Sequence, residues 1–315
     1  MYYPYFRGKQ FELLALRESA EVLAEASFVP IIEPVRESLN GLERALAAIG
    51  DAGGRAIVIV NPRHGDHKDD GANISAFLSD NYRGNDAISA GVLLLSTTSF
   101  DEAEALISSH AQHSPAIVHS GFTAARDVAE FLRDREIEAT NVFSEAHASM
   151  LYRKHFGSGN RVLVRDGFEQ KKNADYEPSA FFSDLHVTFE DLNMQGYGDF
   201  LTVGDRYTEG GGPAYAVAIH LTYIDPTQDN AMYVYHFKSD SNDTPTDPAN
   251  KFAEALAKLI AKLDSVDSKL LATSATEEFR RLYEAGHFPG LGYIKKLSIR
   301  HHIETLADYH RNVDG

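Results

Sequence analysis

Cysteine is absent from the 315 residues, which excludes disulfides, thiolate metal sites and cysteine nucleophiles. Long apolar runs are absent as well, since none approaches the ~18–20 residues of a membrane-spanning helix. The N-terminal stretch "MYYPYFRGKQ" has no apolar segment of signal-peptide length before its charges. We therefore expect a cytoplasmic protein that makes no contact with a membrane.

Basic residues are the minority among the charged ones: 30 lysines and arginines stand against 46 aspartates and glutamates, a formal net charge of −16. Such a field repels nucleic-acid phosphates, so nucleic acid is not expected as a partner. An acidic surface is also ordinary for a cytoplasmic protein. Apolar residues make up 43% of the chain, which is enough for a substantial core.

A unit of a short apolar run, a polar end and a helical pattern recurs along the first half of the chain. The runs are too short for helices and apolar on consecutive positions, as in a parallel sheet covered on both faces. They lie at 28–35, 55–61, 90–96, 115–121, 139–145 and 161–168. Helical patterns lie between them at 38–50, 99–110, 123–135 and 146–156, with Ser38 and Ser99 as expected N-caps.

The spacing of about 27 residues per unit predicts an α/β fold, a TIM-barrel-like (β/α) repeat. A doubly wound open sheet is the alternative. No G-x-G-x-x-G motif follows the first strand, so dinucleotide binding of that kind has no support. No other cofactor is indicated.

After residue 168 the rhythm becomes irregular. Residues 198–207 are expected to form a seventh strand, and "TEGGGP" (208–213) lacks the usual crossover helix. The segments 214–224 and 231–239 alternate at period two and predict an inserted β-hairpin. Helices are expected at 252–263 and 275–286. We expect one domain over 1–315, with the barrel over 28–240 and a C-terminal helical extension over 250–315.

Polar residues follow the predicted strands, and in a barrel they converge on one mouth at the carboxyl ends of the strands. Such a set suits phosphate or carboxylate chemistry, with arginine as anion clamp and His or Glu as proton carrier. The alternative is that strands become polar simply where they leave the core. The catalytic candidates are Glu33, His119, Glu145 and Asp166. The substrate-binding candidates at these strand ends are Asn61, Arg63, Arg165, Asp205 and Arg206.

The loop "VNPRHGDHKDD" (60–70) contains His64, Asp66 and His67 in the order of half a zinc-hydrolase motif. Pro62 stands where that motif has its first histidine, and zinc needs three or four close ligands. A metal site at these residues is a weak alternative, and we predict none.

The hairpin and the N-terminus supply two further expectations. A turn centred on "DPTQDN" places His220 opposite His236 and Ala218 opposite Lys238, so the two histidines are added to the substrate-binding candidates. Solvent-exposed histidines are the alternative. The aromatic N-terminus around Phe6 is expected to be a first strand or a plug on the barrel. His301 and His302 are adjacent in a helix, are not expected to face one partner, and receive no role.

The N-terminal "YPYFRGKQFELLALRE", followed by "VPIIEPVR", resembles the start of the beta-protein family of bacteria and phages. A late "GDF" at residues 198–200 and a strand region rich in tyrosine and histidine add to the resemblance. It implies similarity along nearly the whole chain, a phage-related setting and a small protein partner encoded nearby. It implies no activity, catalytic residues or cofactor.

Two hypotheses follow. The first is a hydrolase or lyase acting on a phosphorylated or nucleotide-like small molecule at the barrel mouth. The second is a non-enzymatic binding or scaffold protein, acting with a partner in anti-phage defence or as a phage component. The missing crossover, the hairpin and the helical tail motivate the second hypothesis, because they offer surface for a partner.

Overall fold

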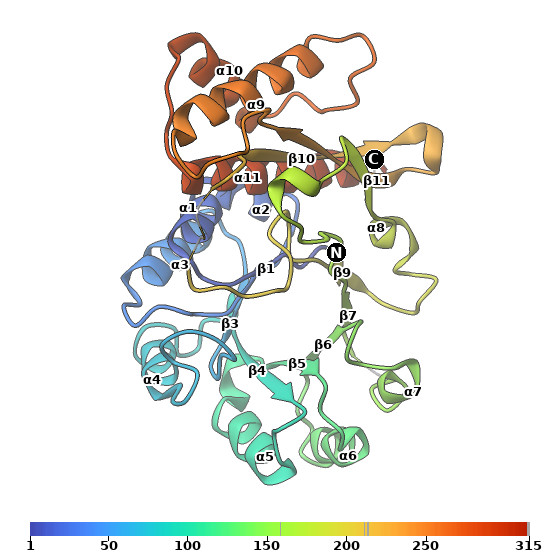
Figure 1. Ribbon diagram of the computed structural model, residues 1–315. Helices are drawn as coiled ribbons and strands as arrows, with labels where there is room; N and C mark the ends of the chain where they lie inside the picture. Colours follow the sequence, from blue (N-terminus) through green and yellow to red (C-terminus); the bar gives the residue numbers. More distant parts are fainter. Residues whose placement is uncertain (158, 211, 213, 314–315) are drawn as a thin grey trace.

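A computed structural model describes residues 1–157, 159–210, 212 and 214–313. Strands and helices alternate through most of this part, and the apolar runs of the sequence form a ring of parallel strands (Figure 1). The strands of the main sheet are β1 (Tyr5–Phe6), β2 (Ile31–Ile32), β3 (Ala56–Ile59), β4 (Ile88–Leu95), β5 (Ala116–Ser120), β6 (Thr140–Ser144), β7 (Arg161–Val164) and β9 (Gly196–Gly198).

Within the described residues the eight strands pair in the order β1-β2-β3-β4-β5-β6-β7-β9, each with its neighbour in parallel. The ring closes where Tyr2 forms a parallel bridge with Tyr197. The Tyr3 and Tyr5 amides donate to the carbonyls of Tyr197 and Asp199, at 2.7 and 2.9 Å. The TIM-barrel-like prediction is thereby confirmed and the open doubly wound alternative is excluded.

Helices cover the outside of the ring. Those of the barrel part are α1 (Gln10–Glu18), α2 (Ala20–Glu25), α3 (Asn40–Asp51), α4 (Ala72–Asn81), α5 (Phe100–Ser109), α6 (Ala125–Asp134) and α7 (Met150–Arg153), with the 3-10 turn η1 (Ala111–His113). Helix α5 begins at the expected cap, because Ser99 and Glu102 form a capping box. The expectation for α3 is wrong by one residue: its N-cap is Leu39 rather than Ser38, without a side-chain bond.

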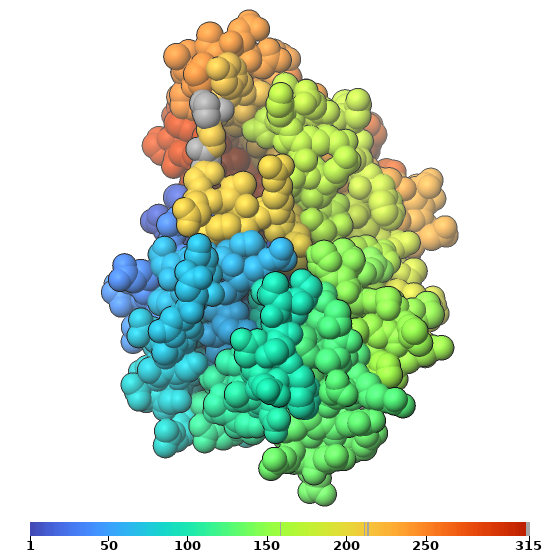
Figure 2. Space-filling view, turned by 60° about the horizontal axis from the view of Figure 1, so that its bottom comes forward, coloured from blue at the N-terminus to red at the C-terminus, as the bar shows by residue number. Residues whose placement is uncertain are grey.

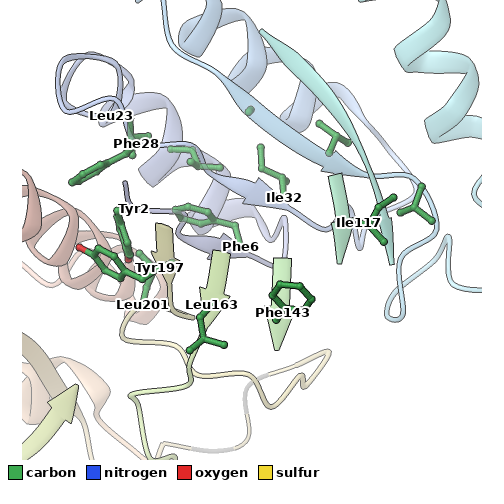
Figure 3. Packing of buried hydrophobic residues seen from close by; sticks show 14 of the residues in the cluster. Tyr2, Phe6, Leu23, Phe28, Ile32, Ile117, Phe143, Leu163, Tyr197 and Leu201 are labelled. Carbon is green, nitrogen blue, oxygen red and sulfur yellow. The ribbon is translucent and has the colours of Figure 1, made fainter. Parts of the chain in front are cut away.

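The strands have two different faces, although their sequences are apolar throughout. Alternate side chains such as Ile57 and Ile59, or Val162 and Val164, fill the inside of the ring. Their neighbours, such as Val58 and Leu163, pack against the surrounding helices. Figure 3 shows part of this outer layer, where Tyr2, Phe28 and Tyr197 gather near the closing strands. The ring centroid of Tyr2 lies 5.0 Å from that of Phe28 and 5.1 Å from that of Tyr197.

The chain leaves the barrel between β7 and β9. It forms η2 (Asn173–Asp175), β8 (Ser179–Ser183) and α8 (Leu185–Thr188) before β9 completes the ring. The predicted strand over 198–207 is therefore wrong in its bounds, because β9 ends at Gly198 and Leu201 adopts a positive φ of 52°. Of the segment 208–213, residues 211 and 213 lie outside the described part.

The predicted hairpin is confirmed as β10 (Ala218–Asp225) and β11 (Ala231–Lys238), joined by η3 (Pro226–Gln228). Its register is the predicted one, with His220 opposite His236 and Ala218 opposite Lys238. Strand β8 adds to β11, so the hairpin belongs to a second, antiparallel sheet and not to the barrel. The barrel begins with β1 at Tyr5, whereas the sequence predicted that it begins at residue 28.

Three C-terminal helices complete the fold: α9 (Pro248–Leu263), α10 (Ser274–Ala285) and α11 (Leu291–Val313). Helices α9 and α10 cover one face of the second sheet, and α11 runs between that sheet and the barrel (Figure 1). In the space-filling view α9 and α10, coloured orange, lie at the end of the molecule opposite the helices α4 to α6 (Figure 2).

His301 and His302 hold α11 in place. Contrary to expectation, both meet one residue, because His301 Nε2 bonds the Thr222 carbonyl at 2.8 Å and His302 Nδ1 bonds the Thr222 hydroxyl at 3.0 Å. His302 Nε2 also lies 3.2 Å from Asp199 Oδ2, and the Tyr2 hydroxyl donates to Asp199 Oδ1 at 2.7 Å. This buried network joins the second sheet, α11 and the seam of the barrel. In the described part, no helix is both long and apolar enough to cross a membrane.

Candidate functional site

The carboxyl ends of the barrel strands surround a small polar cavity, which we call the mouth cavity. Its free volume is about 30 Å³, room for about one or two water molecules. It is lined by Tyr5, Arg7, Glu33, Arg63, Leu93, Val118, Ser120, Val142, Ser144, Val164, Phe200 and Asp205. Three of the predicted residues therefore meet here: Glu33, Arg63 and Asp205.

Glu33 follows β2 and is the most buried charge of the mouth, with 1% of its surface exposed. Its Oε2 accepts from the Tyr5 hydroxyl at 3.0 Å and from Arg7 Nη1 at 2.7 Å. Its Oε1 accepts from the backbone amides of Arg63 and His64, at 2.8 and 3.1 Å. Four donors thus hold a single carboxylate, which fixes the loop after β3 over the end of β2.

Arg7 follows β1 directly and is only 7% exposed. Its guanidinium joins two carboxylates, Glu33 and Asp205. Its Cζ lies 4.7 Å from the ring centroid of Tyr5 and 5.0 Å from that of Phe200, and its Nε has no hydrogen-bond partner. The turn after Arg7 needs glycine, because Gly8 has a φ of 61° and a Cβ there would lie 2.8 Å from the Glu33 carbonyl oxygen.

The loop after β3 carries the free cation of the mouth. Asn61 extends the strand ladder with its side chain, which donates to the Leu93 carbonyl and accepts from the Leu93 amide, both at 2.8 Å. Arg63 is exposed, and among the described residues no carboxylate forms an ion pair with it. A cation that faces a cavity without a partner is suited to bind an anion.

The three candidate metal ligands of this loop are engaged separately. His64 stacks on Tyr207 at 4.5 Å, Asp66 accepts from the Glu37 amide, and His67 Nε2 bonds the Arg36 carbonyl. No three His, Asp or Glu side chains in the part of the chain that is described are grouped to hold a metal ion. Burial lowers the pKa of His64, against the attraction of Glu33, so this ring is neutral at neutral pH.

Residues 205–208, which we call the strap, lie against the mouth from outside. Arg7 binds Asp205, Lys9 Nζ donates to the Thr208 carbonyl, and Lys9 Nζ lies 4.6 Å from the Tyr207 ring centroid. In Figure 2 the yellow segment that contains the strap lies between the blue and the green parts of the barrel. Of the strap residues, Asp205 is part of the cavity wall.

Two other predicted residues belong to the strap region. Asp166 Oδ2 accepts the Asp205 amide at 2.8 Å, and partial desolvation raises the pKa of Asp166 although its side chain keeps contact with solvent. Arg206 is exposed, and its carbonyl accepts a bond from Gln170. Neither residue lines the mouth cavity.

Glu145 and Arg165 lie near the mouth but outside its cavity. Arg165 Nε and Nη2 donate to the two oxygens of Glu145 at 2.6 and 2.9 Å, and Nη1 donates to Asp184 at 2.5 Å. Inward positions on these strands are Ser144 and Val164, so the next residue of each points away from the axis. With two carboxylates bound, Arg165 has little capacity left for a ligand anion.

The structure places His119 away from the mouth, against expectation. Val118 and Ser120 face the cavity, so alternation turns His119 outward into the layer between strands and helices. There it is fully buried, stacks on Phe143, and bonds the Tyr152 hydroxyl at 2.8 Å and Asn141 Oδ1 at 3.0 Å. Burial lowers the pKa of His119 to about 4.

His220 and His236 form a pair in the second sheet, also outside the mouth cavity. Their Nδ1 atoms lie 2.7 Å apart, so one ring donates to the other. Phe168 and Tyr176 surround the pair. Burial lowers the pKa of His220 to about 3 and that of His236 to about 4, so both rings are neutral over the physiological range.

Sequence reasoning missed Arg7 and Ser144 as wall residues of the mouth cavity, and it gave no role to Ser120, although this serine ends a predicted strand. A usable signal existed for the two serines, because each lies two positions after an inward valine. For Arg7 the signal was weak, since β1 has only two residues.

A larger cavity of about 750 Å³ lies at the opposite end of the barrel. Its wall mixes Arg55 and Arg133 with Asp86, Glu136 and Glu138. Residues at that end of a TIM barrel ordinarily contribute to stability. Because the lining carries both positive and negative side chains, it does not favour a ligand of either charge. The mouth cavity is therefore the better candidate.

The fold and the mouth cavity together define a TIM-barrel-like α/β protein with a polar cavity at the carboxyl end of its strands. No family model, curated protein or solved structure matches the chain significantly. Membership of the beta-protein family stays a prediction.

Proposed function

We propose that the chain is a hydrolase or lyase that binds a phosphorylated or nucleotide-like small molecule at the mouth cavity. One observation carries the proposal: Arg63 lines the cavity and has no carboxylate partner among the described residues. Ser120 and Ser144 add hydroxyl groups on the opposite wall. A guanidinium and hydroxyls that converge on one space are the donors that phosphate oxygens require.

The neighbouring residues take different roles. His64 is the proposed proton carrier: it does not line the cavity itself, but it follows Arg63, which does, its backbone amide bonds Glu33, and its half-buried ring is neutral. Glu33, with four donors on its carboxylate, acts as a positioning residue for Arg7 and for the Arg63 loop. His119, Glu145 and Arg165 are left out, since other side chains already occupy their polar atoms away from the cavity.

Ligand entry requires movement of the strap, because the cavity volume of about 30 Å³ is far below the roughly 300–1,000 Å³ of ordinary ligand pockets. Asp205 is the group that must leave. Its carboxylate occupies Arg7, and a ligand phosphate would replace it on the same guanidinium.

The binding test compares Arg63→Gln with wild type over a panel of nucleoside monophosphates and sugar phosphates, by calorimetry. Loss of a charge-assisted hydrogen bond is expected to weaken binding about tenfold or more. The matched control is Arg126→Gln, which removes an exposed arginine of α6. Equal affinity of wild type and Arg63→Gln for every member of the panel would reject the proposal.

Turnover is tested separately with His64→Gln. The variant is expected to keep its affinity for the panel ligand and to lose about 10²–10⁴-fold of the turnover rate, the usual contribution of an acid–base group. The measurement is product formation followed by phosphorus NMR. Full activity in His64→Gln would remove that residue from the mechanism.

A second candidate function, a binding protein that acts with a partner in phage–host conflict, is favoured by the edge of the second sheet. Phe181 lies on the edge strand β8 with 54% of its surface exposed, and its ring meets Tyr233 at 5.7 Å. Light scattering after co-expression with the neighbouring gene product tests this candidate. A monomer without a co-purifying partner would count against it.

A further inference from the structure

Arg153 and Arg161 lie together at the amino end of β7, far along the strand from the mouth cavity. Arg153 ends α7 and Arg161 begins β7. Arg161 Nη2 donates to the Arg153 carbonyl at 3.4 Å, and Arg161 Nη1 donates to the Asn193 carbonyl at 3.0 Å. The Cζ of Arg161 lies 5.9 Å from the ring centroid of Phe143.

This pair lacks the counter-ion that comparable arginines have. Every other described arginine that is at least partly buried has a carboxylate within 4.0 Å, namely Arg7, Arg165, Arg280 and Arg300. Neither Arg153 nor Arg161 forms such a pair within the described residues. In addition, Arg153 Nε, Arg153 Nη1 and Arg161 Nε are buried without any hydrogen-bond partner.

The charges around this pair also favour a bound anion. Burial and the charge of Arg153 lower the pKa of Arg161, as expected for two cations that share a site without an anion. The exposed Lys154 and His155 follow on the same segment, so basic residues cluster here in a chain of net charge −16. Buried donors without acceptors and adjacent like charges are the features that a bound oxyanion would satisfy.

We propose that Arg153 and Arg161 bind a phosphate group, at a second site independent of the mouth cavity. Two guanidinium forks match the geometry of phosphate oxygens, which lysines alone do not. The phosphate could belong to a soluble molecule or to a phospholipid headgroup. Met150 and Leu151 lie three and two residues before Arg153 on α7, with 65% and 72% of their surfaces exposed, and they make the second source testable.

The decisive experiment titrates inorganic phosphate into the full-length chain by calorimetry, in chloride buffer of constant ionic strength. All chains carry Arg63→Gln, so the mouth cavity does not contribute. Adding Arg153→Gln is expected to weaken phosphate binding about tenfold or more, because a charge-assisted contact is lost. Arg153 suits the test because its side chain forms no described hydrogen bond whose loss would unfold the site. Adding Arg126→Gln instead is expected to change nothing.

Unchanged phosphate affinity on adding Arg153→Gln, or no phosphate binding in the Arg63→Gln chain, overturns the inference. A wild-type affinity that Arg63→Gln alone abolishes would support the mouth cavity and reject this second site.

Co-sedimentation with phosphatidylcholine vesicles, with and without phosphatidic acid, distinguishes the two sources of the phosphate group. Binding that needs phosphatidic acid and is lost in both Arg153→Gln and Met150→Ser/Leu151→Ser identifies a headgroup; phosphate binding without vesicle binding identifies a soluble ligand.

Discussion

At the scale of single residues, the mouth is organised by one carboxylate. Glu33 neutralises Arg7, orders the Tyr5 hydroxyl and holds two amides of the loop that carries Arg63. A buried charge of this kind stabilises only while its partners remain, because an unpaired charge in the interior is costly. The same residue therefore controls both stability and the placement of the free arginine.

Replacing Glu33 by glutamine leaves Arg7 with the partly exposed Asp205 as its only carboxylate. We expect a loss of about 3 kcal/mol in the free energy of unfolding, typical of breaking one side of a buried ion pair. Urea unfolding followed by circular dichroism measures it. The control, Glu284→Gln on the exposed face of α10, should lie within about 0.5 kcal/mol of wild type. Equal stability of the two variants would contradict the role given to Glu33.

At the scale of elements, some helix and strand boundaries are determined by interactions within a few residues, and others by tertiary packing. Only the first kind can be predicted from the sequence. The cap of α5 was predictable, because Ser99 and Glu102 act within one turn. The cap of α3 was not, because tertiary packing lets that helix begin without a side-chain bond. The positions of the barrel strands could be predicted from runs of β-branched residues such as Ile57–Ile59. The edge strand β8 has no such run and was not predicted.

Ser99→Ala tests the α5 cap directly. It removes the hydroxyl that accepts from the Glu102 amide and donates to the Glu102 carboxylate, so we expect about 1 kcal/mol of destabilisation. Ser108→Ala, at an exposed position of the same helix, serves as the control and should be nearly neutral. Equal unfolding midpoints for the two variants would show that the capping box contributes nothing.

For the site, the sequence did not predict which residues of a strand face the barrel axis. The residues before His119, Ala116 to Val118, are apolar on both faces of the strand. Their pattern therefore does not tell which residues face the axis. Glu33 and Arg63 were placed correctly at the mouth, and His119 was not. Arg7 went unrecognised because a two-residue strand has no period, and closure depends on contacts with residues almost 200 positions away.

At the scale of the whole molecule, neutral histidines are spread through the interior. Burial lowers the pKa of His119, His186, His236 and His301 to about 4 and that of His220 to about 3. These rings bind protons more readily in the unfolded chain, where the pKa is about 6.5. Their contribution to stability is therefore complete above about pH 6.5 and is lost as the pH falls toward about 4.

We expect the urea midpoint to fall steadily between about pH 6.5 and about pH 4.5, as the unfolded state takes up these protons. The raised pKa of Glu12 offsets a small part of this loss. Replacing the outward His119 by glutamine should reduce the slope of stability against pH, while His155→Gln, at an exposed position, should leave it unchanged. A midpoint that stays constant over this range would contradict the burial of neutral rings.

The seam between Tyr2 and Tyr197 has a consequence for biosynthesis. Residues 2–6 are synthesised before their edge partner, which follows only after some 190 further residues. Until then the nascent chain carries a half-built sheet with two open edges, a state prone to mispairing. Tyr2 therefore reaches its final contacts with Asp199 and with His302 of α11 only after the ribosome has made both of these distant segments.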